Sequence, residues 1–212
     1  MSVPAIPTPT PAAHHDARDL PDRVALALTR LLRWTADTFF ARRYGHRAVV
    51  LETVAAVPGM VGATLQHLRA LRRRGDDGGR VRLLLAEAEN ERMHLVTFLA
   101  IAQPTSLERL LVLLAQGFFF NAFFLLYLLS ARTAHRLVGY FEEEAVLSYT
   151  RFLHEIDSGR IANVAAPAVA IAYWKLPPEA RLRDVVMAVR ADEMHHRDTN
   201  HELADALRNC QF

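Results

Sequence analysis

Two copies of a Glu-x-x-His pattern, far apart in the sequence, constrain this chain more than any other feature. Glu91 and His94 form the first pair, and Glu193 and His196 form the second. Residues three apart on a helix share a face, so each pair directs a carboxylate and an imidazole toward one point. Two such pairs, joined by a lone Glu from each of two more helices, make the carboxylate-bridged two-metal site of helical bundles.

The surroundings of the pairs favour metal ligands over a solvated helix face. A single Glu-x-x-His pair occurs often by chance, but Glu91 and His94 lie among Leu84, Ala88, Leu95 and Phe98. A buried carboxylate costs several kcal/mol unless it is paired. Two divalent ions would neutralise four Glu side chains and leave both His side chains neutral. This charge balance predicts that the four Glu and two His side chains bind metal ions.

Two further glutamates complete the predicted set. Glu52 is an isolated acid in the apolar run 51–60; its alternative reading is a carboxylate paired with Arg47 or Arg69. Glu142 belongs to a Glu triplet whose members point roughly 100° apart on a helix, so only one faces a core. We select Glu142 because it shares its face with Val138, Ala145 and Tyr149, and we expect Glu143 to face solvent.

Three nearby residues have candidate supporting roles. Tyr149 lies two turns from Glu142 on the same face, either as a core residue with a satisfied hydroxyl or as a redox-active phenol beside the metals. His195 is two residues from Glu193 and diverges from it, so His196 is the predicted ligand. Asp192 or Asp198 can orient a ligand His, and Asn90 and Asp192 are the residues that we expect to hold ligands in position.

The sequence predicts one all-α domain over residues 21–212. We expect residues 1–20, which are rich in Pro and Ala, to form a disordered arm in front of it. Helical patterns cover about residues 21–43, 47–73, 81–101, 110–129, 134–156 and 181–209. Pro58 and Gly59 should break or kink the second helix. Pro167, Pro177 and Pro178 bracket a short element that contains Tyr173 and Trp174.

Residues 110–129 are apolar enough to cross a bilayer. If they did, however, Glu52 and Glu91 would lie on the opposite side from Glu142 and Glu193, and no single site could form. We therefore expect this helix to enter one leaflet only, with the flanking Arg109, Arg132 and Arg136 at lipid headgroups. The basic helix 21–43 either lies in the membrane interface or packs on the bundle with its Arg side chains in water.

Composition sets the remaining expectations. The formal net charge of the 212 residues is +2, and we expect no nucleic-acid partner. Cys210 is the single cysteine, so no intrachain disulfide can form and a reducing compartment is favoured. The first twenty residues resemble neither a secretory signal nor a transit peptide. We expect the cytoplasmic face of a bacterial inner membrane, with the matrix side of the mitochondrial inner membrane as the alternative.

Four segments, residues 51–60, 88–94, 141–150 and 190–200, resemble the signature boxes of the alternative oxidases, which are cyanide-insensitive di-iron ubiquinol oxidases. The resemblance implies a six-helix monotopic protein, usually a homodimer, with a ferritin-like four-helix bundle around two iron ions. It implies iron ligands at Glu52, Glu91, His94, Glu142, Glu193 and His196, and a catalytic role for Tyr149. The implied reaction couples ubiquinol oxidation to the four-electron reduction of O2 to water, without proton pumping.

The resemblance also implies a quinol pocket formed by Arg47, Leu51, His135, Glu144 and Ser148. Plastoquinol is a close alternative substrate, because the plastid quinol oxidases share the boxes. Other classes are a ferritin-like iron-binding or ferroxidase bundle, a soluble di-iron hydroxylase or desaturase, and a non-enzymatic membrane-bound helical protein. The apolar run 110–129 argues against a soluble ferritin-like cage.

Overall fold

A computed structural model of the chain describes residues 14–40, 44–102 and 106–209; residues 35–40, 44–51, 102, 106–108, 111 and 209 are described by their backbone only. Within these ranges the protein is all-α. The helices are α1 (Leu20–Phe40), α2 (Tyr44–Arg73), α3 (Arg80–Ala102), α4 (Ser106–Leu129), α5 (Ala131–Asp157), α6 (Ala168–Trp174) and α7 (Leu182–Asn209).

The six long helices that the sequence predicts are present, and their ends differ from the predicted ones by a few residues. The short element between the prolines is helix α6, which brings the number of helices in the described residues to seven. Helix α2 continues through Pro58 without a break, because its residues on both sides of the proline are helical.

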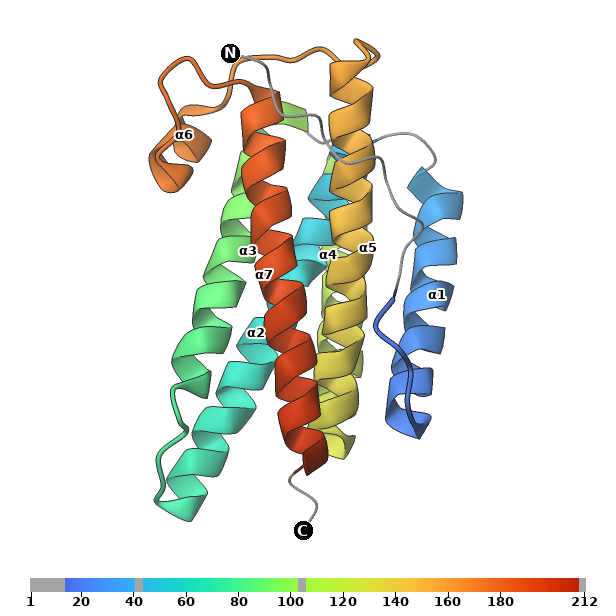
Figure 1. The fold of residues 1–212 in the computed structure, drawn as a ribbon, viewed down its shortest axis with the longest axis vertical. Coiled ribbons are helices and arrows are strands. Elements are labelled where there is room, and N and C mark those ends of the chain that lie inside the picture. Colours follow the sequence, from blue (N-terminus) through green and yellow to red (C-terminus); the bar gives the residue numbers. More distant parts are fainter. Residues whose placement is uncertain (1–13, 41–43, 103–105, 210–212) are drawn as a thin grey trace.

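Helices α2, α3, α5 and α7 form a four-helix bundle, in which α2 packs most extensively on α3 and α5 on α7 (Figure 1). Helix α1 lies alongside α5, and α4 packs against α2 and α5. The short α6 contacts α3 near one end of the bundle. This arrangement brings the two predicted Glu-x-x-His helices, α3 and α7, into the same bundle.

Two apolar clusters fill the interior, one on each side of Glu142 along α5. One holds Phe98, Tyr149 and Phe152 together with valines of α7. The other holds Val57, Phe123 and Leu137, so it joins α2, α4 and α5. Because polar groups are costly in such surroundings, a carboxylate between these clusters needs a compensating partner.

Two glycines allow close approaches within the bundle. A Cβ at Gly59 would lie 2.6 Å from the backbone oxygen of Leu84, so glycine lets α2 and α3 pack tightly next to Pro58. A Cβ at Gly139 would lie 2.5 Å from the ring of His201, so glycine leaves the space that this histidine occupies between α5 and α7.

Residues 14–19, at the end of the predicted arm, lie against α5. The backbone N–H of His15 donates to Glu143 Oε1 at 2.7 Å, and the Tyr140 hydroxyl donates to the His15 carbonyl at 2.9 Å. Residues 1–13 lie outside the described residues. The division of the chain into an arm and a domain at residue 20 stays a prediction.

Helix α4 is apolar and largely exposed. Its segment Val112–Leu129 has a mean hydropathy of 2.0, and only 11% of that window is buried inside the protein. Among the described residues it is the one helix that is long and apolar enough to cross a membrane by length and composition. Large apolar side chains such as Leu113, Phe118 and Leu129 are exposed along it.

Candidate metal centre

The six predicted ligand side chains converge inside the four-helix bundle, where all six are buried. Their nitrogen and oxygen atoms form two overlapping groups, and within each group the atoms lie within 4.8 Å of one another. The first group contains Glu52, Glu91, His94 and Glu193, and the second contains Glu91, Glu142, Glu193 and His196. Each group therefore has one lone Glu and one His of its own, while both share the two glutamates of the Glu-x-x-His pairs.

The imidazoles point into these groups through Nδ1. His94 Nδ1 lies 3.4 Å from Glu52 Oε2, 3.3 Å from Glu91 Oε2 and 3.5 Å from Glu193 Oε1. His196 Nδ1 lies 2.7 Å from Glu91 Oε1 and 3.6 Å from Glu193 Oε2. Several donors thus surround a common point in each group, as metal ligands do.

Six buried atoms of this cluster lack a hydrogen-bond partner of acceptable geometry among the described residues. They are Glu52 Oε2, both carboxylate oxygens of Glu91, His94 Nδ1, Glu193 Oε2 and His196 Nδ1. Buried polar atoms normally have a partner, and leaving one without costs stability. Two divalent cations fit this donor set, because carboxylate oxygen and imidazole nitrogen are good ligands for transition metals such as iron.

The charges of the cluster show the same need for cations. Burial and the nearby Glu91 charge raise the pKa of Glu52 well above its usual range, and burial with the Glu193 charge does the same for Glu142. Burial would lower the pKa of His94, but the Glu91 carboxylate and Asp192 outweigh it and raise that pKa. The nearby Glu193 and Glu91 carboxylates likewise raise the pKa of His196 to about 11 against burial. These shifts show that the carboxylates and imidazoles lie close enough for their charges to interact strongly, as the ligands of two cations would.

Tyr149 lies at the edge of this cluster. Its hydroxyl donates a short hydrogen bond to Glu52 Oε1, and its ring stacks on Phe98 with the ring centroids 5.7 Å apart. Burial and the Glu52 charge raise the pKa of Tyr149 well above its usual range, so the phenol stays protonated. The side chain is both a core residue and a direct neighbour of a candidate ligand.

A polar group on the outer side of His94 fixes the orientation of its ring. His94 Nε2 lies 3.2 Å from Asp192 Oδ2, which also accepts from Asn90 at 2.9 Å and from the Trp174 indole at 2.8 Å. Asn90 also donates to the Tyr173 hydroxyl at 3.0 Å. Asn90 and Asp192 are the residues expected here from the sequence, whereas Tyr173 and Trp174 had no predicted role. The signal in the sequence that could have pointed to Tyr173 and Trp174 was their position in a short element bracketed by prolines.

Of the five predicted quinol contacts, three have described side chains, and these three do not share one face of α5. Arg47 and Leu51 have side chains outside the described residues. Glu144 faces α1, where it accepts from Arg33 at 2.7 Å. His135 lies nine residues earlier in α5, roughly half a turn around the helix, and is buried in the bundle. Ser148, four residues after Glu144, shares the Glu144 face of α5, and its side chain is half-buried.

Two expectations about charged side chains are wrong. Glu143 does not face solvent: it is buried and accepts from His201 Nε2 at 2.9 Å, because α7 and residues 14–15 cover this side of α5. Arg136 is fully buried and cannot reach a lipid headgroup. Its guanidinium binds Asp22 of α1 and Asp205 of α7, two partners that are distant in the sequence. His195 is exposed, whereas His196 faces the cluster.

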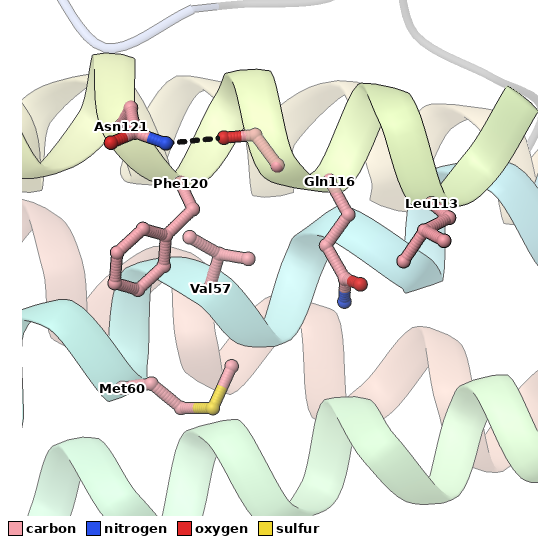
Figure 2. A pocket seen from close by; sticks show the side chains of 7 residues that line it. Val57, Met60, Leu113, Gln116, Phe120 and Asn121 are labelled. Carbon is pink, nitrogen blue, oxygen red and sulfur yellow. Dashed lines mark hydrogen bonds between the residues drawn. The ribbon is translucent and has the colours of Figure 1, made fainter.

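A separate cavity of about 260 Å³ lies between α2 and α4 and is lined by Val57, Met60, Leu113, Gln116, Gly117, Phe120 and Asn121 (Figure 2). Gln116 extends from α4 toward α2 and donates to the Thr53 carbonyl at 3.0 Å. Asn121 instead bonds back to the Gly117 carbonyl of its own helix. The cavity contains none of the candidate ligands, so it is distinct from the metal centre.

The fold and the site define a class: helical-bundle proteins with buried carboxylate and histidine groups capable of binding metal. The model of the alternative oxidase family matches residues 8–205. The chain therefore belongs to the alternative oxidase family.

Curated relatives agree with this assignment. The chain is 58% identical over 192 residues to the mitochondrial ubiquinol oxidase 1c of Arabidopsis thaliana, and 60% identical to ubiquinol oxidase 1a of the same plant. It is 59% identical to the mitochondrial ubiquinol oxidase 1a of Oryza sativa subsp. japonica. Each match covers 91% of this chain but only 54% to 58% of the relative. The chain thus spans little more than half the length of these relatives.

Proposed function

We propose that this protein oxidises ubiquinol and reduces O2 to water at two iron ions bound by Glu52, Glu91, His94, Glu142, Glu193 and His196. The observation that carries the proposal is the convergence of these six buried side chains, six of whose oxygen and nitrogen atoms lack a hydrogen-bond partner among the described residues. Membership of the alternative oxidase family supports the same chemistry, and the relatives carry the name ubiquinol oxidase. That name favours ubiquinol over plastoquinol.

When bound, two iron ions supply the redox chemistry by accepting electrons from quinol and passing them to O2. The protein holds the ligands in place: Asp192 binds Nε2 of His94 and leaves Nδ1 facing the carboxylates. The Tyr149 phenol donates a hydrogen bond to Glu52 Oε1, and we propose that this phenol takes part in electron transfer. The apolar clusters on either side exclude water from the reacting groups.

We propose that the quinol head group binds on the α1 side of α5, near Glu144 and Ser148, with Arg47 and Leu51 as further contacts. Glu144 accepts a hydrogen bond from Arg33 of α1. In the sequence it lies two residues after Glu142, a candidate ligand. His135 was assigned to the same pocket, but its opposite position on α5 makes it the weakest of the five candidates.

We propose that the protein is monotopic and enters one membrane leaflet through α4 and the exposed apolar side chains of α1, including Leu31 and Trp34. The small buried fraction of α4 supports this proposal, because a helix with this composition needs an apolar partner. A homodimer would cover exposed leucines such as Leu68 and Leu71 of α2 and Leu85 of α3. The relatives are named mitochondrial, and the predicted bacterial location stays a prediction.

The deciding experiment measures O2 uptake by purified protein of known iron content, with a short-tailed ubiquinol and with cyanide present. We expect rapid uptake that cyanide does not inhibit, and slower uptake with plastoquinol. Protein with two bound irons that consumes O2 only when Fe2+ is supplied would contradict the proposal and indicate a ferroxidase. In proteoliposomes, turnover should produce no proton gradient.

A further inference from the structure

One more acidic side chain is buried in the bundle but belongs to neither ligand group. Glu87 of α3 lies one helical turn before Glu91, and only 6% of the residue is exposed. Both of its carboxylate oxygens accept from Asn200 Nδ2 of α7, at 2.9 and 3.1 Å. Asn200 is neutral, so these hydrogen bonds bring no positive charge to the Glu87 carboxyl. A buried carboxyl without a bound cation is costly to keep ionised, so this residue needs an explanation.

Asn200 connects Glu87 to a chain of buried polar side chains. Asn200 Oδ1 lies 2.9 Å from His135 Nδ1, and His135 Nε2 lies 3.0 Å from the Tyr127 hydroxyl. Gln66 Nε2 donates to the same hydroxyl at 3.2 Å. These five buried residues come from α2, α3, α4, α5 and α7. Buried polar networks of this extent are costly unless every member is satisfied.

In this hydrogen-bonded chain of side chains, every hydrogen bond is donated in the direction of Glu87. Asn200 uses its N–H on the carboxylate, so its oxygen must accept from His135 Nδ1–H. The other ring nitrogen of His135 then accepts from the Tyr127 hydroxyl, and Tyr127 accepts from Gln66. Burial lowers the pKa of His135 to about 4, which is consistent with a neutral ring. The chain thus stabilises a negative charge on Glu87.

Opposing effects act on the charge of Glu87. Burial raises its pKa to about 7, although the His196 charge and the Asn200 hydrogen bond lower it. The negative Glu91 and Glu193 also contribute to this rise, and Glu142 of α5 is a third nearby acid. A carboxyl that both holds and releases a proton near neutral pH is suited to general acid chemistry.

We propose that Glu87 supplies protons to the buried metal centre, and that Asn200, His135 and Tyr127 stabilise the carboxylate left behind. This inference rests on the proposed function, because reduction of one O2 to two waters takes up four protons and four electrons, which two quinols supply. In each transfer the Glu87 O–H bond breaks, a new O–H bond forms on the oxygen that is being reduced, and Glu87 regains a proton that quinol oxidation has released. The residue therefore ends each cycle unchanged.

The first test compares Glu87→Gln with Glu87→Asp and with the control Glu89→Gln, an exposed acid on the same helix. We expect Glu87→Gln to retain iron but to lose turnover by roughly 100-fold, as loss of a general acid does, with a larger solvent deuterium isotope effect. Glu87→Asp should recover part of the rate, and Glu89→Gln should match the wild type. Wild-type rates and isotope effects in Glu87→Gln would overturn the proposal.

The second test needs no turnover. Infrared difference spectra of the wild-type protein, recorded as the pH is varied, should show a protonated carboxyl band that titrates near neutral pH and is missing in Glu87→Gln. Tyr127→Phe, which keeps the acid but removes one donor of the chain, should shift this band. If no such band titrates, Glu87 does not exchange protons and the proposal fails. If the band titrates but the wild type consumes no O2 with quinol, the proposed function fails instead.

Discussion

The protein contains two buried clusters of charged side chains, which differ in how the charges are neutralised. In the first, the Arg136 cluster, the guanidinium donates to Asp22 at 3.0 Å and to His201 at 2.8 Å, and it also binds Asp205. In the second, the carboxylate cluster, six oxygen and nitrogen atoms of Glu52, Glu91, His94, Glu193 and His196 have no hydrogen-bond partner among the described residues. Both clusters involve α5 and α7.

The contrast separates a structural cluster from a functional one. The guanidinium of Arg136 supplies both the positive charge and the donors that its neighbours need, so this cluster is complete and ties α1 to the bundle. The carboxylate cluster gathers four glutamates whose charges oppose one another, since burial and the neighbouring negative charges raise the pKa of Glu52 and Glu142. Incomplete buried clusters of this kind mark binding sites for ions.

The largest expected effect follows from Glu91→Ala. Because Glu91 belongs to both ligand groups, its removal should abolish iron binding at the centre and reduce quinol-dependent O2 uptake by at least roughly 100-fold. Iron analysis and O2 uptake measure the two effects. Glu89→Ala, the exposed control on α3, should leave both unchanged, and full turnover in Glu91→Ala would refute the ligand assignment.

Arg136→Met breaks the complete cluster instead. It leaves Asp22 buried with its remaining partner Arg132, so we expect a loss of about 3–5 kcal/mol in the free energy of unfolding. Iron binding by the folded protein should persist. Chemical denaturation measures the loss, with the exposed Arg151→Met as control. Equal stability of the two variants would show that the Arg136 cluster is not structural.

Tyr149→Phe tests the edge of the carboxylate cluster without changing its charge. We expect both irons to be retained and turnover to fall by at least about tenfold, equivalent to roughly 1.4 kcal/mol in the barrier. Tyr140→Phe, on the same helix but bonded to His15, is the control. Normal turnover in Tyr149→Phe would remove this phenol from the mechanism.

Asp192→Asn should weaken the support of His94 while keeping its neighbours in place. We expect iron affinity to fall by roughly 10- to 100-fold, as for other residues that hold a ligand histidine. Competition with a chelator measures the affinity, and the exposed Asp198→Asn serves as control. An unchanged affinity would mean that packing alone orients His94.

The smallest expected effect is a change in how the stability of the protein depends on acidic pH. The hydrogen bond from Arg136 holds the pKa of Asp205 below its usual value of 3.8, against burial. A lowered folded pKa stabilises the protein above the unfolded pKa, and this contribution is lost as the pH falls through the folded value. Asp205→Asn should therefore cost no more than about 1 kcal/mol at neutral pH and should flatten the loss of stability below about pH 4. Parallel stability curves for both proteins would contradict this.

The sequence could predict what depends on helical periodicity within one segment. The spacing of Glu91 with His94 and of Glu193 with His196 placed each pair on one face, and the phase of Val138 and Tyr149 selected Glu142 from its triplet. These side chains do lie together, although their role as iron ligands stays a prediction. The long helices follow from the same periodicity.

The sequence could not predict which surfaces other segments cover. Glu143 and Arg136 looked solvent-facing because their partners, such as His201 and Asp22, lie on other helices. Glu87 was available to the same reasoning, since it lies four residues before Glu91 on the same face, but an acid in the first half of a helix is also common at the surface. Only the packing of α3 in the tertiary structure distinguishes a buried acid from a surface acid at this position.

The sharing of Glu91 and Glu193 by both ligand groups links the filling of one position to the filling of the other. A first cation would relieve the mutual repulsion of the carboxylates and draw them toward the geometry that the second requires. Loading should thus be cooperative, and a titration with Fe2+ should pass from empty to fully loaded protein with little of the half-filled form between.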